Sequence, residues 1–436
     1  MNRHAHKIIF NKRLGCMVVV SEIVSSQGRG SSTTGYSGSV ARVLLKPLAF
    51  ALMVMLGSAQ IVPVQAQIVA DPSAPKHQQA TILPTASGAT QVNIQTPTAA
   101  GVSMNQYKQF DTQSNGTVLN NSRTNTSTQT AGWIQGNPWL ATGSARVIVN
   151  QVNSAHPSLL KGNIEVAGQR AEVIIANPAG IQVNGATFIH AARTTLSTGT
   201  PMLDNGSLTG HQVKQGQVSI HGEGLNTTDS DYTDILARSA DINAGIWAKQ
   251  LKVTAGVNTV NADNTQATAQ AAEGAAPQFA IDTSALGGMY AGKISLVGTE
   301  QGVGVHNAGQ IAASAGQVTV DVNGQLSNSG TINSNGADNQ TRIASQSLHN
   351  TGTISSQGNT HIQTGQVANS GTLAAGRELR LDATDIHNRQ GTINGQRVEL
   401  NANSLDNTQG KIQQTGSQGL ALNAGSLNNA NGGLVG

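Results

Sequence analysis

The last third of the chain repeats one short pattern seven times. Each copy places an apolar residue before an asparagine, a glycine two or three positions later, and then a small or polar residue and an apolar residue. Successive asparagines are 19 to 22 residues apart, and a period near twenty is typical of one supersecondary unit stacked on copies of itself. The seven repeat asparagines are Asn307, Asn328, Asn350, Asn369, Asn388, Asn407 and Asn429.

Between these asparagines the sequence alternates as a half-buried strand does. Val318, Val320 and Val322 alternate with Thr319 and Asp321, and this period of two buries one face and exposes the other. Asn and Gly accept positive φ more readily than other residues, so each Asn-x-Gly segment is interpreted as a corner. Three short strands and three corners per repeat predict an all-β fold, a right-handed parallel β-helix or solenoid with coils roughly 4.8 Å apart. Unrelated hairpins with Asn-Gly turns would not keep one period through seven copies.

The composition agrees with a narrow solenoid. Only 3% of the 436 residues are aromatic and 11% are charged, whereas 50 are glycine. So few rings would be unusual in a globular domain. A coil interior too narrow for rings is instead filled by stacked Val, Ile, Leu and Ala.

The first 66 residues have the features of a signal peptide. Leu48–Gly57 is an apolar run, too short to cross a bilayer but suited to the hydrophobic part of a signal peptide. Small residues at Val64 and Ala66 predict cleavage between Ala66 and Gln67. We therefore expect a cleaved or helical signal segment, with an uncleaved signal anchor as the alternative.

Removing this segment changes what the charge implies. It holds seven of the 25 basic residues and one of the 22 acidic residues, so the remainder carries 18 basic and 21 acidic residues, a net charge of −3. No basic patch for nucleic acid is expected. The single cysteine, Cys16, lies in the same segment, so a cysteine nucleophile or Cys-ligated metal is not expected in the mature chain.

The region from Gln67 to about Gly304 leads into the repeats. Four prolines mark Asp71–Ala100 as an irregular start, and we expect short strands there that cap the first coil, because an open coil end exposes strand edges. Asn261–Pro277, rich in Ala, Gln, Asn and Thr, is interpreted as a surface loop. Strand signals occur at Val147–Val149, Ala171–Ile175, Val218–Ile220, Leu251–Val253 and Ile294–Val297.

Several of these segments resemble a known family. Met1–Ser25 resembles the extended signal region of very large secreted proteins of Gram-negative bacteria. Four further segments resemble the secretion domain of filamentous haemagglutinins and contact-dependent-inhibition exoproteins, the secreted partners of two-partner secretion systems: 106–122, 132–151, 168–201 and 286–309. The family tetrads NPNL and NPNGI appear here as Asn137-Pro138-Trp139-Leu140 and Asn177-Pro178-Ala179-Gly180-Ile181, each without its second asparagine.

The resemblance implies three parts and two export partners. Residues 1–66 would be the extended signal peptide, 67–304 the secretion domain as a capped β-helix, and 305–436 a truncated set of haemagglutinin-type repeats. The inner-membrane secretion machinery would read the signal peptide, and an outer-membrane transporter would export the chain to the surface of a Gram-negative cell. The Asn-Pro turns would either set the first coils or engage the transporter, and a corner needed only for folding is the alternative.

An enzyme is the competing class, since parallel β-helices include polysaccharide lyases and hydrolases. The densest acidic run, Asp229, Asp231 and Asp234, lies among threonines and serine and is interpreted as a solvated loop or helix cap rather than a metal site. His221 and Glu223 flank Gly222, but this pair alone does not indicate a catalytic site. No catalytic or phosphate-binding motif is present. We expect no enzyme, no cofactor and no metal.

The sequence thus predicts a secreted, filamentous-haemagglutinin-like exoprotein that acts as a surface adhesin or display rod. The alternative within this frame is the N-terminal fragment of a contact-dependent growth inhibition toxin, whose toxin domain would lie downstream. Because the chain stops in mid-repeat at Gly436, a fragment, a truncated gene or a decayed copy is expected. The receptor is not indicated by the sequence.

Overall fold

The computed structural model describes residues 6–11, 16–21, 67–336 and 338–436, and the chain forms two separate units, Met1–Val64 and Gln65–Gly436. In the first unit, β1 (His6–Asn11) and β2 (Cys16–Ser21) pair antiparallel. The described part of the leader is therefore extended rather than helical, in keeping with the strand preference of its Ile and Val residues. The predicted apolar run Leu48–Gly57 and the cleavage residue Ala66 lie outside the described residues.

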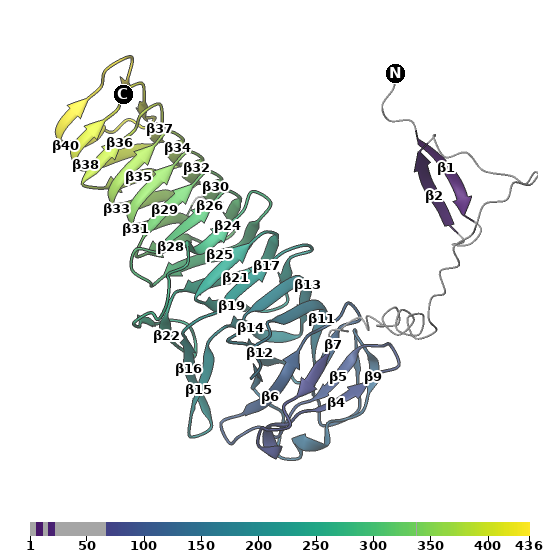
Figure 1. Cartoon of the computed structure of the whole chain (residues 1–436). Helices are drawn as coiled ribbons and strands as arrows, with labels where there is room; N and C mark the ends of the chain where they lie inside the picture. The colour runs from purple at the N-terminus through teal and green to yellow at the C-terminus, as the bar shows by residue number, and fades with distance from the viewer. Residues whose placement is uncertain (1–5, 12–15, 22–66, 337) are drawn as a thin grey trace, which may run out of the picture. The chain divides into compact units, whose positions relative to one another are not determined.

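The second unit is a β-solenoid of about 13 turns, and 60% of the structure is strand against 2% helix. Most strands are stacked in parallel as three faces along one rod (Figure 1). A single coil consists of β26 (Gly304–Asn307), β27 (Gln310–Ala313) and β28 (Val318–Val322), one strand for each face. The predicted parallel β-helix is confirmed. The ladders continue without a break past residue 304.

Long strands bend from one face to the next, so some of them belong to two faces. The first face, which carries β26, also contains β11 (Ser158–Gly168), β13 (Ile181–Ile189), β17 (Gln217–Ile220), β20 (Ser239–Ile242), β24 (Phe279–Thr283), β29 (Gln325–Asn328), β31 (Gln340–Asn350), β33 (Asn359–Asn369), β36 (Asp385–His387), β38 (Arg397–Asp406) and β40 (Ala421–Asn428). The second face, which carries β27, contains β5 (Thr90–Asn93), β7 (Thr117–Asn121), β11, β13, β18 (Leu225–Thr227), β21 (Gly245–Ala255), β25 (Gly288–Gly298), β30 (Thr331–Ser334), β32 (Thr353–Ser356), β34 (Thr372–Ala375), β37 (Thr392–Gly395), β39 (Lys411–Gln414) and β41 (Leu434–Val435). The third face, which carries β28, contains β6 (Val102–Phe110), β10 (Val147–Val152), β12 (Ala171–Ala176), β14 (Ala191–Ser197), β19 (Tyr232–Ala237), β21, β25, β31, β33, β35 (Glu378–Asp382), β38 and β40.

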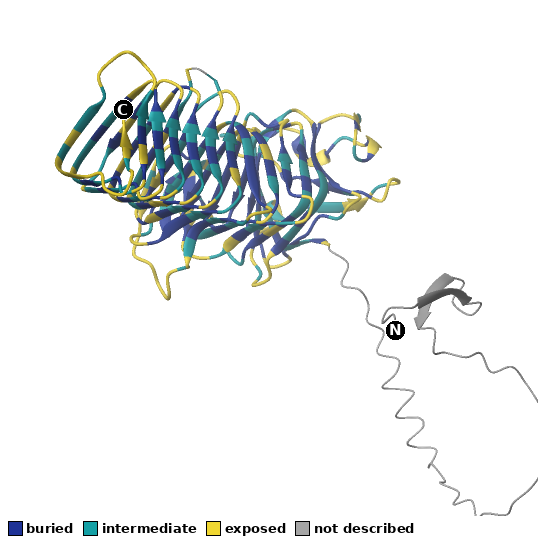
Figure 2. Ribbon diagram, turned by 90° about the horizontal axis from the view of Figure 1, so that it is seen from above, coloured by how far each residue is buried: buried dark blue, intermediate teal, exposed yellow. Residues whose placement is uncertain are grey.

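Buried residues line up from coil to coil along the solenoid (Figure 2), and the hydrophobic ones among them form columns that make up the core. Val305 pairs with Leu326 and Ile311 pairs with Ile332 on successive coils, and all four side chains are fully buried. Burial therefore alternates along each strand, as the period of two predicts.

The expectation of an interior without rings holds only for part of the rod. The sequence after residue 304 has no aromatic residue. In the N-terminal turns, however, Tyr107, Phe110 and Phe188 are buried, and the rings of Tyr107 and Phe110 meet edge to face with centroids 5.0 Å apart. The interior of these first turns therefore accommodates rings, unlike the interior of the repeats.

The cap closes the N-terminal end of the solenoid, as predicted from the prolines. β3 (Ile68–Ala70) pairs antiparallel with β6, and β4 (Thr81–Pro84) pairs antiparallel with β5. The other cap elements are η1 (Lys76–Gln78), the hairpin of β8 (Thr126–Thr128) with β9 (Gly132–Ile134), and η2 (Pro138–Leu140). Within the described ranges, no helix is long and apolar enough to cross a bilayer.

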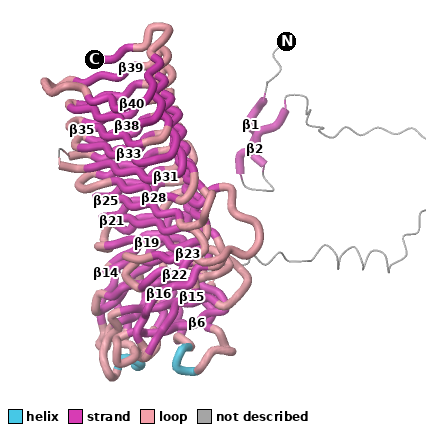
Figure 3. Tube along the Cα trace, turned by 90° about the vertical axis from the view of Figure 1, so that its left-hand side faces the viewer, coloured by secondary structure: helices cyan, strands magenta, loops and turns pink. Residues whose placement is uncertain are grey.

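A four-stranded antiparallel sheet lies against the outside of the third face (Figure 3). It consists of β15 (Thr200–Asp204), β16 (Ser207–Val213), β22 (Asn258–Asn261) and β23 (Ala267–Ala269), and we call it the side sheet. The interpretation of 261–277 as a loop is therefore wrong at its start. Asn264, at φ 53°, turns the chain back so that β23 pairs with β22.

The side sheet is needed because the third face is apolar on its outside over the first turns. Val149 and Ile174 form an outward cluster against which Leu208 of β16 packs, and Val213 and Val260 pack on Leu236 of β19. This burial on both faces explains the unbroken apolar run Val173–Ala176 in β12.

Candidate functional site

The first Asn-Pro corner, Asn137–Leu140, joins the cap to the first turns. Asn137 is only 3% exposed, and its Oδ1 accepts a hydrogen bond from the backbone N–H of Trp139 at 3.0 Å. Its Nδ2 donates to the carbonyl oxygens of Ile94, at 2.8 Å, and Asn120, at 2.9 Å. One amide thus caps the turn and ties it to two other segments, so all its polar atoms are used inside the fold.

The second corner, Asn177–Ile181, joins β12 to β13 and uses the same device. Asn177 is fully buried, and its Oδ1 accepts from the backbone N–H of Ala179 at 2.9 Å. Its Nδ2 donates to the carbonyl oxygen of His156 at 2.9 Å and to Oγ of Ser158 at 3.0 Å. This amide links the corner to the start of β11, one coil earlier.

The remaining residues of the corners shape the chain. Pro138 and Pro178 follow the asparagines directly, and proline fixes φ and donates no hydrogen bond, so the turn is preformed. Leu140 and Ile181 are fully buried in the core. Gly180 has φ 120°, a conformation that residues with a Cβ rarely adopt.

The positions of the two missing asparagines contribute backbone rather than side chain to these turns. Trp139 and Ala179 each donate an N–H to the asparagine two residues earlier, and any residue other than proline supplies that group. The Trp139 side chain points away from the core, is 44% exposed and donates from Nε1 to Oγ1 of Thr81 at 3.0 Å. The geometry explains why these positions tolerate other residues.

The repeat asparagines form a ladder along the inside of the first face. In each step the Nδ2 of one asparagine donates to Oδ1 of the next one a coil later, at 2.7 or 2.8 Å, from Asn307 through to Asn429. Asn307 to Asn407 are at most 2% exposed, whereas Asn429 is exposed. The ladder begins at Asn307, whose Oδ1 has no partner among the described residues.

The repeat glycines were predicted to supply positive φ at the corners, but the structure gives three of them a different role. Gly330, Gly352 and Gly371 do not have positive φ. A Cβ at each of them would lie 2.1 Å from the carbonyl oxygen of the corner glycine one coil earlier, namely Gly309, Gly330 and Gly352. Glycine is therefore required for close approach between coils. In the longer corners the positive φ falls on Gln390 and Gln409 instead.

Comparison with known proteins places this architecture in a family. The family model of the TPS secretion domain, the secretion domain of two-partner secretion, matches residues 66–328. The chain belongs to the TPS family. A second family model, the extended signal peptide of the type V secretion system, matches residues 1–50 of this TPS protein. The protein is therefore secreted or held at the cell surface.

The TPS chain is similar to several large proteins. Toxin CdiA of Yersinia pestis is 48% identical over 364 residues, 83% of this chain but 11% of that protein. tRNA nuclease CdiA-2 of Burkholderia pseudomallei is 45% identical over 344 residues, 76% of this chain and again 11% of that protein. The chain thus spans about a tenth of the length of these relatives.

The fold of the TPS chain also matches a solved structure. The crystal structure of the filamentous hemagglutinin secretion domain aligns with a TM-score of 0.54 and 28% sequence identity, covering 82% of this chain and 99% of that one. The resemblance inferred from the sequence motifs is confirmed.

Sequence reasoning missed the buried polar residues in the first turns of the TPS chain. Asn120 donates to Oδ1 of Asn93 at 2.8 Å, and the Asn121 side chain exchanges hydrogen bonds with the backbone N–H and carbonyl of Ala145 at 2.7 and 2.9 Å. Tyr107 donates its hydroxyl to Asn150 at 3.0 Å, and burial raises the Tyr107 pKa. The Asn-Asn pair that directly follows the apolar residues Val118 and Leu119 in β7 was the available signal.

The acidic run is paired rather than grouped around a site. Asp231 is held by Arg170 at 2.8 Å and Lys249 at 3.0 Å, and these hydrogen bonds lower its pKa. Asp234 is buried, not solvated as predicted, because the side sheet covers it; it pairs with Arg193 at 2.6 Å. Asp229 accepts from the backbone N–H of His190, while His221 and Glu223 lie on a separate turn. Among the described residues, no group of three or more His, Cys, Asp or Glu side chains could hold a metal.

Proposed function

We propose that this chain is the export and scaffold portion of a two-partner secretion exoprotein that crosses the outer membrane unfolded and folds outside into a rod. The family match implies an outer-membrane partner transporter. We further propose that 67–304 acts as the secretion domain and that the repeats from 305 extend the rod. In this view the rod presents a repetitive polar surface for adhesion or display.

The two Asn-Pro corners support a role in folding rather than direct recognition of the transporter by the folded protein. Both asparagine amides are buried, and each one joins its own turn to another segment of the first turns. A transporter could reach these amides only before the corners form. We therefore propose that the corners set the first coils, on which later coils are assembled.

Assembly of the rod would also favour export in one direction. Each coil that forms buries an apolar column and adds one asparagine to the ladder, so the folded coils cannot slide back through a narrow pore. The asparagine ladder is the observation that most supports this proposal, because it makes each coil a template for the next.

A second function is favoured by the relatives. Two of the similar proteins are named Toxin CdiA and tRNA nuclease CdiA-2. We infer as the alternative that this chain is the N-terminal part of a contact-dependent growth inhibition protein, in which the rod displays a toxin. We propose no enzymatic activity for the present residues; sugar release from pectin-like polymers by the purified rod would argue otherwise.

The export proposal is tested by substituting the corner asparagines in cells that carry the partner transporter. Asn137→Ala and Asn177→Ala should each reduce release into the medium at least fivefold. Asn243→Ala is the matched control, since Asn243 is exposed and its side chain donates only to neighbouring Asp241. Release unchanged in both corner variants would remove any essential role for these asparagines.

A refolding measurement separates folding from recognition. If the corners act through folding, the same variants, purified from denaturant, should also refold more slowly and unfold at lower urea concentration than wild type. Variants that lose secretion but refold as wild type does would place the asparagines in transporter recognition instead.

A further inference from the structure

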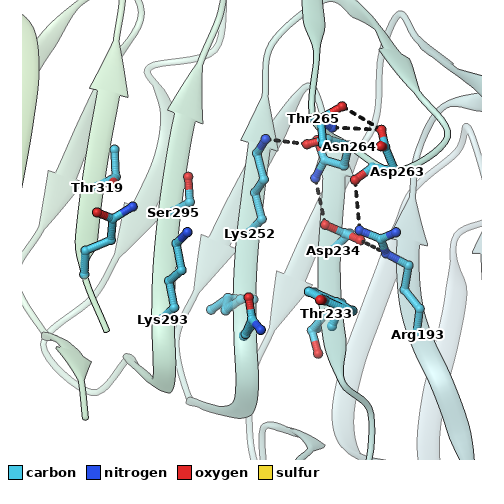
Figure 4. A pocket seen from close by; sticks show the side chains of 14 residues that line it. Arg193, Thr233, Asp234, Lys252, Asp263, Asn264, Thr265, Lys293, Ser295 and Thr319 are labelled. Atoms are coloured by element: carbon cyan, nitrogen blue, oxygen red, sulfur yellow. Dashed lines mark hydrogen bonds and ion pairs between the residues drawn. The ribbon is translucent and has the colours of Figure 1, made fainter. Parts of the chain in front are cut away.

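A groove lies on the outside of the third face, beside the turn that joins β22 to β23 (Figure 4). Its cavity volume is about 630 Å³, within the range of small-ligand sites. Its floor is formed by outward side chains of β21, β25 and β28, and one wall by the turn around Asn264. We call it the hairpin groove.

The wall of the hairpin groove is fixed by hydrogen bonds. Asn264 is 3% exposed; its Nδ2 donates to Oδ1 of Asp234 at 2.8 Å, and its Oδ1 accepts from Oγ1 of Thr254 at 2.9 Å. Lys252 donates to the carbonyl oxygen of Asn264, and Arg193 donates to that of Asp263 at 2.9 Å. The groove is therefore preformed, and a ligand would not have to order its wall.

The floor, in contrast, carries polar side chains without partners. None of the described residues exchanges a side-chain hydrogen bond with Gln250, Lys293, Gln317, Ser295 or Thr319. Gln250 pairs with Lys293 in the register, and Gln317 precedes Val318, the partner of Ile294. Lys293 thus has an amide side chain one coil away on either side, roughly 4.8 Å in each direction.

Three cations, Arg193, Lys252 and Lys293, and two carboxylates, Asp234 and Asp263, line the groove, so one positive charge is in excess. Arg193 is paired with Asp234, and Lys252 is bound to a carbonyl oxygen and partly buried. Lys293 is exposed, and no described carboxylate lies within ion-pair distance of it. Tyr232, 47% exposed at the edge of the groove, adds an apolar ring surface. An ammonium between two amides and two hydroxyls suits an anionic group attached to a polyhydroxylated ring.

We propose that the hairpin groove binds an acidic saccharide. Lys293 meets the carboxylate or phosphate of the ligand, Gln250 and Gln317 bind the hydroxyls next to it, and Ser295 and Thr319 bind the adjoining sugar. This function lies beyond export, because the groove forms only once the side sheet is folded on the solenoid.

The proposal is tested by titration calorimetry on the full chain purified from the culture medium. The probes are trigalacturonate, a mannose trisaccharide carrying a 6-phosphate, and neutral maltotriose. Trigalacturonate, the phosphorylated trisaccharide or both should bind at least tenfold more tightly than maltotriose, and the two acidic probes identify whether carboxylate or phosphate is preferred. Equal binding of all three probes, or no binding, would overturn the proposal.

Substitutions locate the site. Lys293→Ala should weaken the acidic probe at least tenfold, and Gln317→Ala threefold or more, whereas Lys411→Ala, an exposed lysine on β39 of the second face, should have no effect. The melting temperature of each variant should equal that of wild type, since these side chains have no partner to lose. Acidic-probe binding that survives Lys293→Ala would place the ligand elsewhere.

Discussion

Asn350 donates a hydrogen bond from Nδ2 to Oδ1 of Asn369, one coil later, at 2.7 Å. Both side chains are buried, and the same Nδ2 also lies 3.2 Å from the carbonyl oxygen of Gly352 in its own corner. Each ladder asparagine therefore satisfies its own turn and the neighbouring coil together. A buried amide with so many partners is costly to remove, because the groups it leaves behind remain desolvated.

We predict that Asn350→Ala lowers the free energy of unfolding by about 2 to 3 kcal/mol, since Asn328 loses its acceptor and Asn369 its donor. Equilibrium urea unfolding of the purified protein measures this. Asn429→Ala is the matched control: Asn429 is exposed at the last rung, and its loss should cost less than about 1 kcal/mol. Equal losses in the two variants would contradict a cooperative ladder.

The corner glycines give a second prediction. Gly352→Ala should destabilise the protein by about 2 kcal/mol or more, because its Cβ would lie 2.1 Å from the carbonyl oxygen of Gly330 and the two coils would have to separate. Gly419→Ala serves for comparison, since a Cβ there meets nothing within 4 Å. Thermal unfolding distinguishes the two. A Gly352→Ala variant as stable as Gly419→Ala would mean that the coils are not in close contact at this corner.

These two predictions show what the sequence could supply. The spacing of the asparagines and the alternation at Val318–Val322 were enough to predict coils, because both patterns act locally and repeat. The reason for the glycines was not accessible: whether Gly352 needs positive φ or close approach depends on the neighbouring coil. The sequence was thus sufficient to predict the coiled fold, but not the reason why glycine is required at its corners.

The side sheet and the hairpin groove were harder to foresee. Ala267–Ala269 has no strand pattern of its own and pairs only because Asn264 reverses the chain. The strand signal at Ala171–Ile175 did indicate a strand, but not that a sheet covers its outer side. Asp234 was predicted to be solvated because the side sheet that buries it is formed by residues distant in the sequence.

The outer surface of β12 leads to a pH prediction. Glu172 pairs in register with Arg193, and its buried Oε1 has no partner among the described residues. Burial raises the Glu172 pKa to about 7. The positive charge of Arg193 opposes this rise in pKa, and the negative charge of Asp234 adds to it. The folded state then binds more protons than the unfolded state between about pH 4.5 and 7, so this group makes stability fall as pH rises through that window.

His211 of β16 acts in the opposite sense, because burial, with Arg193 nearby, lowers its pKa to about 4. Its contribution therefore makes stability rise between about pH 4 and 6.5.

The Glu172→Gln variant separates the contribution of the Glu172 carboxyl from that of His211. The free energy of unfolding of this variant relative to wild type should increase by about 1 to 3 kcal/mol from pH 5 to pH 8. Urea unfolding at the two values measures this, with Glu273→Gln in an exposed loop as the control. A difference that is constant or shrinks with pH would refute a proton held on Glu172.

Restoring the family tetrad provides a fourth prediction. Trp139→Asn should change release from cells with the transporter by less than twofold, because this position contributes its backbone N–H to Asn137 and Asn keeps that group. Quantifying the secreted protein against the cellular pool tests it. A severalfold gain in release would show that the second asparagine has a side-chain role of its own in export.

The central claim, that the secreted chain winds into coils held in one register, is tested most directly by cysteine cross-linking. Thr353 and Thr372 face outward and lie opposite each other on β32 and β34, about 4.8 Å apart and within disulfide range. Protein from the culture medium with cysteines at 353 and 372 should form this disulfide under mild oxidation. A 353 and 374 pair, offset by two residues and roughly 8 Å apart, should not. Equal or reversed yields from the two pairs would contradict the register and, with it, the ladder.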